Sequence, residues 1–97
     1  MNGDIIMKIK VKIFATLRDS VGWKEKEYNV EAKDINDFLK EVVGGKLYNI
    51  IMDKSKGELN PQYKILLNGR DIDFLDGLKT KLKDQDLIAI FPPVGGG

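Results

Sequence analysis

Three stretches of the sequence together predict an α+β fold, in which a mixed β-sheet packs against one main helix. Residues 7–13 alternate apolar and charged side chains, as a half-buried strand does. Residues 34–43 carry apolar side chains at helical spacing, and residues 87–91 are an unbroken apolar run of strand length. The full order is strand, strand, helix, strand, short strand, strand, so we expect the helix to cover one face of the sheet.

Composition places the chain among small globular domains and excludes several kinds of chemistry. Its 97 residues suffice for one modest core, and 16 basic against 15 acidic residues leave a net charge of +1. No overall field therefore draws the molecule to nucleic acid or to a membrane. Cysteine and histidine are absent, which rules out disulfides and removes the commonest general base and zinc ligand. Without a membrane-spanning stretch or a signal-peptide core, we expect a cytoplasmic protein.

The first two strands are expected to form a hairpin. The β-sheet domain should begin at Met7, after a disordered leader over residues 1–6, and end at residue 91. A turn or short helical piece over residues 15–21, closed by Gly22, leads to a second strand over residues 24–30. The short connection makes the two strands antiparallel. The residues expected to face inward are Met7, Ile9, Val11, Ile13, Tyr28 and Val30, and those expected to face outward include Lys8, Lys10 and Lys12.

The clearest helix runs from Asp34 to Val43, with Asp34 as its N-cap and Gly44-Gly45 as its stop. Its apolar residues follow the stripe of an amphipathic helix. A shorter helix over residues 46–53 should follow, and then a polar loop over residues 55–61. The stripe consists of Ile35, Phe38, Leu39, Val42 and Val43.

The second half of the chain returns to strands. A third strand over residues 63–67 leads into Asn68-Gly69, a strong hairpin signal, and a short return strand over residues 70–73. An irregular stretch with leucines at 75, 78 and 82 precedes the final run. Because residues 87–91 do not alternate, we expect a central strand covered on both faces. The tail, residues 92–97, would then leave from the middle of the sheet.

No catalytic constellation is visible in the sequence. Ser20 and Ser55 have no histidine to activate them. Acidic residues two positions apart occur three times, and we expect them at the solvated surface. Acids at 71, 73 and 76 fit no calcium loop, so no metal site is predicted. The three acidic pairs are Glu25 with Glu27, Asp71 with Asp73, and Asp84 with Asp86.

Two lysine clusters, at positions 8, 10 and 12 and at positions 79, 81 and 83, leave alternatives open. A basic stripe is a footprint of nucleic-acid binding, but no aromatic stacking residues are interleaved with these lysines. The even balance of charges favours a mixed solvated face. An acidic protein partner would use the same lysines.

The C-terminal end is the most informative stretch of the chain. It reads Phe91-Pro92-Pro93-Val94-Gly95-Gly96-Gly97. The prolines stop the strand and stiffen the exit, and the glycines that follow have no side chains. A frayed terminus would explain flexibility, but not a buried strand, two prolines and bare glycines together. The arrangement suits a carboxylate that is itself the reacting group, since a glycine tip enters a narrow activating site that excludes water.

This ending, and Val11-Lys12-Ile13-Phe14-Ala15-Thr16-Leu17-Arg18-Asp19 near the start, resemble the MoaD small subunit of molybdopterin synthase. MoaD belongs to the MoaD/ThiS-type sulfur carriers, and the resemblance extends from Met7 to Gly97. It implies a ubiquitin-like β-grasp fold.

The resemblance also implies a reaction cycle run by other proteins, so the chain is not expected to be catalytic alone. A ubiquitin-activating-type adenylyltransferase (MoeB-like) would adenylate Gly97 with ATP and magnesium, and a sulfur donor would convert it to a thiocarboxylate. A MoaE-like large subunit would then receive the sulfur for the pterin. The chain itself would bind no cofactor. By position in the motif, Gly97 carries the sulfur, Gly95 and Gly96 give access, and Phe91, Pro92, Pro93 and Val94 contact partners.

Two departures from the bacterial pattern leave a second function open. The segment from Lys46 to Asn60 is longer than in compact small subunits, and Gly95 stands where the family often has another small residue. Both features resemble the archaeal MoaD-like group, which includes small archaeal modifiers conjugated through the terminal glycine to lysines of target proteins. A sulfur carrier is the leading hypothesis, a ubiquitin-like modifier the second, and a plain interaction domain the third.

Overall fold

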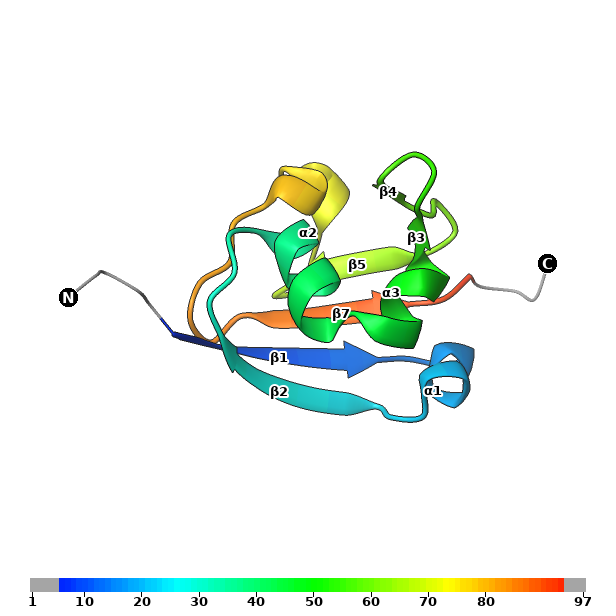
Figure 1. Ribbon diagram of the computed structural model, residues 1–97, viewed down its shortest axis with the longest axis horizontal. Coiled ribbons are helices and arrows are strands. Elements are labelled where there is room, and N and C mark those ends of the chain that lie inside the picture. Colours follow the sequence, from blue (N-terminus) through cyan, green and yellow to red (C-terminus); the bar gives the residue numbers. More distant parts are fainter. Residues whose placement is uncertain (1–5, 94–97) are drawn as a thin grey trace.

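The sheet that the sequence predicts is present, with strand β7 at its centre (Figure 1). The computed structural model describes residues 6–93, so most of the predicted leader and the tip of the tail lie outside the described residues. The sheet has five strands in the order β2-β1-β7-β5-β6. β1 and β7 are parallel and the other pairs are antiparallel, so the sheet is mixed. The strands are β1 (Met7–Ile13), β2 (Glu25–Val30), β5 (Lys64–Leu67), β6 (Arg70–Asp71) and β7 (Leu87–Phe91).

The predicted hairpin of the first two strands is confirmed. β1 and β2 pair from Met7 opposite Val30 to Lys12 opposite Glu25. The apolar residues of β1 are buried and its lysines are not, as the alternation requires. The short helix α1 (Thr16–Val21) connects the strands and ends at Gly22, whose φ of 85° lies in the left-handed region that glycine tolerates.

The predicted main helix forms, but only its first turn is α-helical. α2 (Ile35–Asp37) continues directly into a π-helical segment, η1 (Phe38–Val43). The Asp34 carboxylate accepts a hydrogen bond from the Asp37 amide at 2.8 Å, which is the expected N-cap. Because the π turn is wider than an α turn, the end of the stripe rotates away from the core. Ile35, Phe38 and Leu39 are fully buried, whereas Val42 and Val43 are only partly buried.

A second helix, α3 (Gly45–Ile51), follows as predicted and lies with α2 on the same side of the sheet (Figure 1). It ends two residues early because Met52 and Asp53 form a strand. β3 (Met52–Asp53) pairs with β4 (Glu58–Leu59) in a small antiparallel sheet. The prediction of a loop over residues 55–61 is therefore wrong for Glu58 and Leu59.

The hairpin signal is also confirmed, although its return strand is shorter than predicted. Asn68 and Gly69 both have positive φ, at 52° and 86°, as a type I′ turn requires. β6 stops at Asp71, whose carboxylate accepts a hydrogen bond from the Asp73 amide at 2.9 Å. That bond caps a 3-10 turn, η2 (Ile72–Phe74), which replaces the end of the predicted strand. A second turn, η3 (Gly77–Lys79), follows in the stretch predicted to be irregular.

The final strand is central as predicted, but only one of its faces is covered. Ile88 and Ile90 have no exposed surface and point to the helices. Leu87, Ala89 and Phe91, on the other face, are only partly buried. The expectation of cover on both faces is therefore wrong, because α2, η1 and α3 all lie on one side. We call the uncovered side of the sheet the open face.

Across residues 6–93, no helix has the length and apolarity needed to cross a membrane. The same part of the chain contains no cluster of three or more acidic residues that is arranged to hold a metal ion.

Candidate functional site at the root of the C-terminal tail

Strand β7, from which the tail leaves, is paired along both of its edges. Its parallel partner β1 places Val11 opposite Ile88 and Ile13 opposite Ile90. Its antiparallel partner β5 places Ile65 opposite Ile90. Because both ladders are filled and the isoleucines of β7 are fully buried, the last strand before the tail is firmly fixed in the sheet.

An aromatic stack closes the end of this strand. The amide of Phe14 donates to the carbonyl oxygen of Ile90 at 3.1 Å, which extends the pairing one residue past β1. The rings of Phe14 and Phe91 stack with their centroids 4.3 Å apart and their planes 10° apart. The Arg18 guanidinium lies 5.7 Å from the Phe14 ring centroid, and its Nε donates to the Ile13 carbonyl oxygen at 2.9 Å. We call Phe14, Arg18 and Phe91 the tail root.

Phe14 and Arg18 are part of this site, but sequence reasoning did not single them out as site residues. The signal lay in the alternation of the first strand. Outward positions 8, 10 and 12 are lysines, and the next outward position is Phe14. An aromatic residue does therefore continue the lysine stripe, at the end where the tail leaves.

The two prolines differ in their surroundings. Pro92 is buried, whereas Pro93 is exposed and Phe91 is partly buried. Pro92 therefore packs against the domain, which fixes the direction of the exit, and Phe91 and Pro93 keep accessible surface. Partner contact through Phe91, Pro92 and Pro93 stays a prediction, and the predicted roles of Val94, Gly95, Gly96 and Gly97 lie outside the described residues.

An apolar strip runs along the open face toward the tail. It consists of Leu87, Ala89 and Phe91 on β7, with Leu66 opposite Ala89 on β5. None of the four is fully buried, although each lies in the sheet with neighbours on both sides. Aliphatic and aromatic side chains at the centre of an otherwise charged face are typical of a surface that another protein covers.

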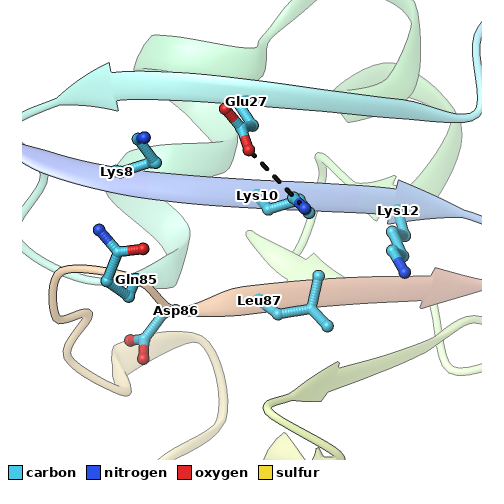
Figure 2. A pocket seen from close by; sticks show the side chains of 7 residues that line it. All are labelled: Lys8, Lys10, Lys12, Glu27, Gln85, Asp86 and Leu87. Carbon is cyan, nitrogen blue, oxygen red and sulfur yellow. Dashed lines mark ion pairs between the residues drawn. The ribbon is translucent and has the colours of Figure 1, made fainter.

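Charged residues on β1 and β2 border one side of this strip. Lys10 forms ion pairs with Glu25 at 3.6 Å and with Glu27 at 3.7 Å, and Figure 2 shows the second of these. These acids are exposed, as predicted for the solvated surface. No other lysine of the stripe has an acidic partner within 4 Å among residues 6–93.

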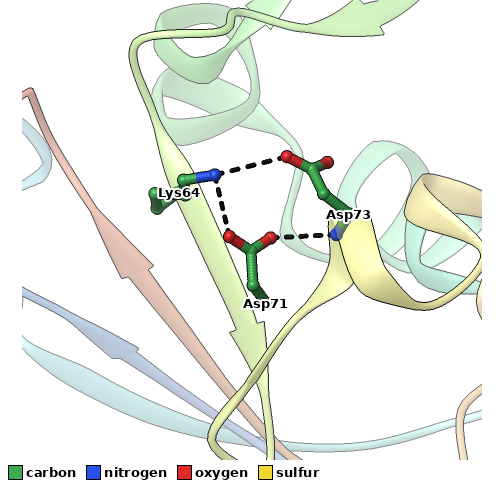
Figure 3. Close-up of polar contacts among 3 residues, drawn as sticks. All are labelled: Lys64, Asp71 and Asp73. Carbon is green, nitrogen blue, oxygen red and sulfur yellow. Dashed lines mark hydrogen bonds and ion pairs between the residues drawn. The ribbon is translucent and has the colours of Figure 1, made fainter.

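The other side of the strip is bordered by a compact ion-pair cluster on β5, β6 and η2 (Figure 3). The Lys64 ammonium lies 2.8 Å from Asp71 and 3.3 Å from Asp73. The hydrogen bond with Asp71 is the main cause that raises the pKa of Lys64, and the same bond is the main cause that lowers the pKa of Asp71. Because the side chains are accessible to water, this cluster is a local charge balance rather than a reactive group.

Asp86 contradicts the surface location that its spacing predicted. It is only 7% exposed, and its carboxylate accepts hydrogen bonds from the Lys83 amide at 2.7 Å and from Asn68 Nδ2 at 2.8 Å. The Asn68 side chain in turn accepts a hydrogen bond from the Leu87 backbone amide at 2.9 Å through Oδ1. The backbone amide of Asn68 donates to the Leu87 carbonyl oxygen. Asp86 and Asn68 thus join the β5–β6 turn to the start of β7, and we call this pair the polar bracket.

A mixed five-stranded sheet with its helices on one face, and a C-terminal strand at its centre, define a ubiquitin-like β-grasp protein. The site adds an exit from that strand into Pro-Pro-Val-Gly-Gly-Gly. Residues 11–97 match the sequence profile of the ThiS family, and the chain belongs to this family.

The similar proteins carry two kinds of name, small archaeal modifier and sulfur carrier. Small archaeal modifier protein 3 of Haloferax volcanii is 36% identical over 95 residues, covering 94% of this chain and 100% of its own. A candidate sulfur carrier protein of Archaeoglobus fulgidus is 32% identical over 94 residues, with 94% and 100% covered. The solution structure of small archaeal modifier protein 1 from Methanosarcina acetivorans superposes with a TM-score of 0.76 at 37% identity, covering 95% of this chain and 98% of that one. The chain is thus a member of the sulfur carrier and small archaeal modifier group.

Proposed function

We propose that this chain carries sulfur as a thiocarboxylate on Gly97 and donates it for molybdopterin synthesis, within the molybdenum or tungsten cofactor pathway. The observation that carries the proposal is the exit of β7. A strand paired on both edges, and closed by the tail root, leads directly into Pro92, Pro93 and the rest of the C-terminal sequence. The domain thus presents its own C-terminus, and membership of the ThiS family supports this reading.

The chemistry begins with activation, because a carboxylate is a poor electrophile. One oxygen of the Gly97 carboxylate attacks the α-phosphorus of ATP, and pyrophosphate leaves with its bonding electrons. The carbonyl carbon of the acyl-adenylate is then attacked by a sulfide-level donor, and AMP leaves to give the thiocarboxylate. Water must be kept from the adenylate during these steps, and glycines at 95 and 96 let the tip enter a site narrow enough to do so.

The reacting groups other than the carboxylate come from partners in this proposal. The chain has no histidine or cysteine to act as base or sulfur donor. A ubiquitin-activating-type adenylyltransferase (MoeB-like) would hold ATP and magnesium, a sulfur donor would supply the sulfide, and a MoaE-like large subunit would hold the pterin. The contribution of this chain is to bind these proteins in turn and to deliver its terminus to each.

A second function, conjugation to other proteins, shares the first step. In that case the neutral ε-amino group of a target lysine attacks the carbonyl carbon of the Gly97 adenylate, AMP leaves, and an isopeptide bond forms. The observation that favours it is the similarity to proteins named small archaeal modifiers, one of them 36% identical. The two functions differ only in the nucleophile that meets the activated terminus.

The test begins with the activation step. The purified chain is mixed with the adenylyltransferase of the same organism, ATP and magnesium, and pyrophosphate exchange into ATP is measured. We expect exchange with the full chain and none with a Gly97-deleted chain whose melting temperature is unchanged. Exchange that continues without Gly97 would contradict the role assigned to Gly97 in both functions.

The second stage separates the two functions. With a sulfur donor present, intact mass should show one terminal oxygen replaced by sulfur, and the loaded chain with the large subunit should convert the pterin precursor. Conjugation predicts instead that glycine remnants from this chain are found on lysines of other proteins after proteolysis. Remnants on lysines without any conversion of the pterin precursor would favour the modifier.

A further inference from the structure

The charges on the open face are distributed unevenly around the apolar strip. On the β1 side they include five cations, and we call these the basic rim. Among residues 6–93, only Lys10 of this rim has an ion-pair partner within 4 Å. Both Glu25 and Glu27 are held by that one lysine, so they do not neutralise the rest of the rim. The basic rim consists of Lys8, Lys10, Lys12, Arg18 and Lys24.

Two shallow hollows lie along the basic rim, and each combines cations with an apolar surface. The first, of about 210 Å³, lies between β1 and the start of β7 and has Leu87 in its lining (Figure 2). The second, also about 210 Å³, lies at the tail root and has Phe14 in its lining. Lys12 lines both, so the hollows follow one another toward the tail.

The acids in the first hollow are already engaged. Glu27 is paired with Lys10, and the Asp86 carboxylate is bonded to Asn68 and the Lys83 amide. Figure 2 shows the Asp86 oxygens turned away from the lysines. At the far end of the rim, Asp84 accepts from the backbone amide of Lys8 at 2.7 Å. The ammonium groups of Lys8 and Lys12 therefore have no side-chain carboxylate of the described chain within ion-pair distance.

The opposite border of the strip has no such surplus. Lys64 is bridged by Asp71 and Asp73, so this cation is already neutralised (Figure 3). A partner that covers the apolar strip would meet uncompensated positive charge on one side only. Such one-sided charge gives orientation as well as attraction, because the reversed arrangement leaves partner carboxylates facing Asp71 and Asp73.

We propose that the basic rim is the orientation determinant for the protein that activates the tail. This inference rests on the proposed function. Carboxylates on one flank of the adenylyltransferase enter the two hollows, and its apolar side chains cover Leu66, Leu87, Ala89 and Phe91. A protein fits better than nucleic acid, because the rim is interrupted by Glu25 and Glu27 and the strip beside it is mainly aliphatic. Nucleic acid would need an uninterrupted row of cations for its phosphates and aromatic side chains on which its bases stack.

The test is charge reversal with a matched control. Lys8→Glu/Lys12→Glu removes charge from the rim, whereas Lys79→Glu/Lys81→Glu makes the same change in net charge at exposed lysines outside both hollows. Binding to the purified adenylyltransferase is measured by calorimetry at low and high salt. We expect the rim variant to bind about tenfold to a hundredfold more weakly, with a flatter salt dependence, and the control to stay within about twofold of wild type.

Three results would overturn the role proposed for the basic rim. Equal losses in both variants would show that only net charge matters, and unchanged affinity in the rim variant would also overturn it. Either result leaves the role of Gly97 standing wherever pyrophosphate exchange persists, so the two failures are distinguishable. A wild-type chain that neither binds the enzyme nor supports exchange overturns both. Loss of binding to a single-stranded oligonucleotide in the rim variant, with enzyme binding unchanged, would assign the rim to nucleic acid instead.

Discussion

The two ends of strand β7 are held by different kinds of contact. Its start is held by the polar bracket, in which the buried carboxylate of Asp86 accepts hydrogen bonds from Asn68 and from the Lys83 amide. Its end is held by the tail root, in which the partly exposed ring of Phe91 stacks on Phe14. The Asp86 carboxylate of the first contact is buried, although Asn68 is itself exposed, whereas the Phe91 ring of the second contact keeps accessible surface on the open face.

This difference separates the residues that determine the fold from those that present the tail. A buried carboxylate depends on its particular hydrogen-bond donors, and removing it leaves those donors without their acceptor. A stack at the surface makes a weaker contribution to folding but keeps apolar area available for another protein. We therefore expect changes at the start of β7 to act on stability and changes at its end to act on partner binding.

The largest effect on stability is expected for Asp86→Ala. The change leaves the Lys83 amide and the Asn68 side chain without their acceptor, and hydrogen bonds to a charged group contribute about 1.5–3 kcal/mol. We expect the free energy of unfolding to fall by about 2–3 kcal/mol in urea titrations, with pyrophosphate exchange by the remaining folded protein unchanged. The control is Asp84→Ala, whose exposed carboxylate accepts from the Lys8 amide, and an equal loss there would contradict the role of burial.

Phe91→Ala should have a smaller effect on folding and a larger one on binding. Loss of the stack and of partly buried aromatic area should lower the free energy of unfolding by about 1–2 kcal/mol. The KM of the adenylyltransferase for this chain should rise by about tenfold, because the variant removes the end of the apolar strip next to the tail. A large drop in melting temperature without any change in KM would show that Phe91 is a core residue only.

Arg18 tests whether the tail root depends on a specific hydrogen bond. Its Nε donates to the Ile13 carbonyl oxygen, and its guanidinium lies near the Phe14 ring. Arg18→Ala should reduce the free energy of unfolding by about 0.5–1 kcal/mol. Arg18→Lys keeps the charge of the basic rim but loses the planar donor, so it should lose similar stability while binding the adenylyltransferase nearly as well as wild type. Equal binding losses in both variants would show that geometry, not charge, is what the partner needs.

Sequence periodicity predicted the parts of this fold that depend on local pattern. The alternation from Met7 to Ile13, the Asp34 cap and the Asn68-Gly69 turn each specify a local conformation, and all three are present. The final run was placed correctly at the centre of the sheet. The predicted cover on both faces is wrong, because an apolar run has the same sequence whether its second face meets a helix or another protein.

The features that sequence reasoning missed depend on contacts between distant segments. Asp86 is buried because Asn68, 18 residues earlier, supplies its donor, and nothing local to the run at 84–86 indicates this. The stack of Phe14 on Phe91 joins the two ends of the domain through the parallel pairing of β1 and β7. The π-helical turn over Phe38–Val43 likewise has no signature in the apolar stripe, whose spacing is compatible with either winding.

The smallest effect on stability is expected for Asp71→Asn. This exposed ion-pair cluster lies beside β7, and its contribution to stability should depend on pH. Asp71 shares Lys64 with Asp73, and its lowered pKa, due first to the hydrogen bond from Lys64, makes the folded state prefer the ionised form. A carboxyl group whose pKa is lower in the folded state stabilises the folded state at pH values above its unfolded-state pKa. This stabilisation is lost as the pH falls through the folded-state pKa. Lys64 acts in the opposite pH range. Because its pKa is raised in the folded state, its contribution to stability is fully present below its unfolded-state pKa and is lost as the pH rises through its folded-state pKa. At neutral pH the exposed cluster should therefore contribute less than any of the three contacts above. Urea midpoints measured from neutral to acid pH should fall less steeply in Asp71→Asn than in wild type, and parallel curves would show that the Lys64 cluster does not respond to folding.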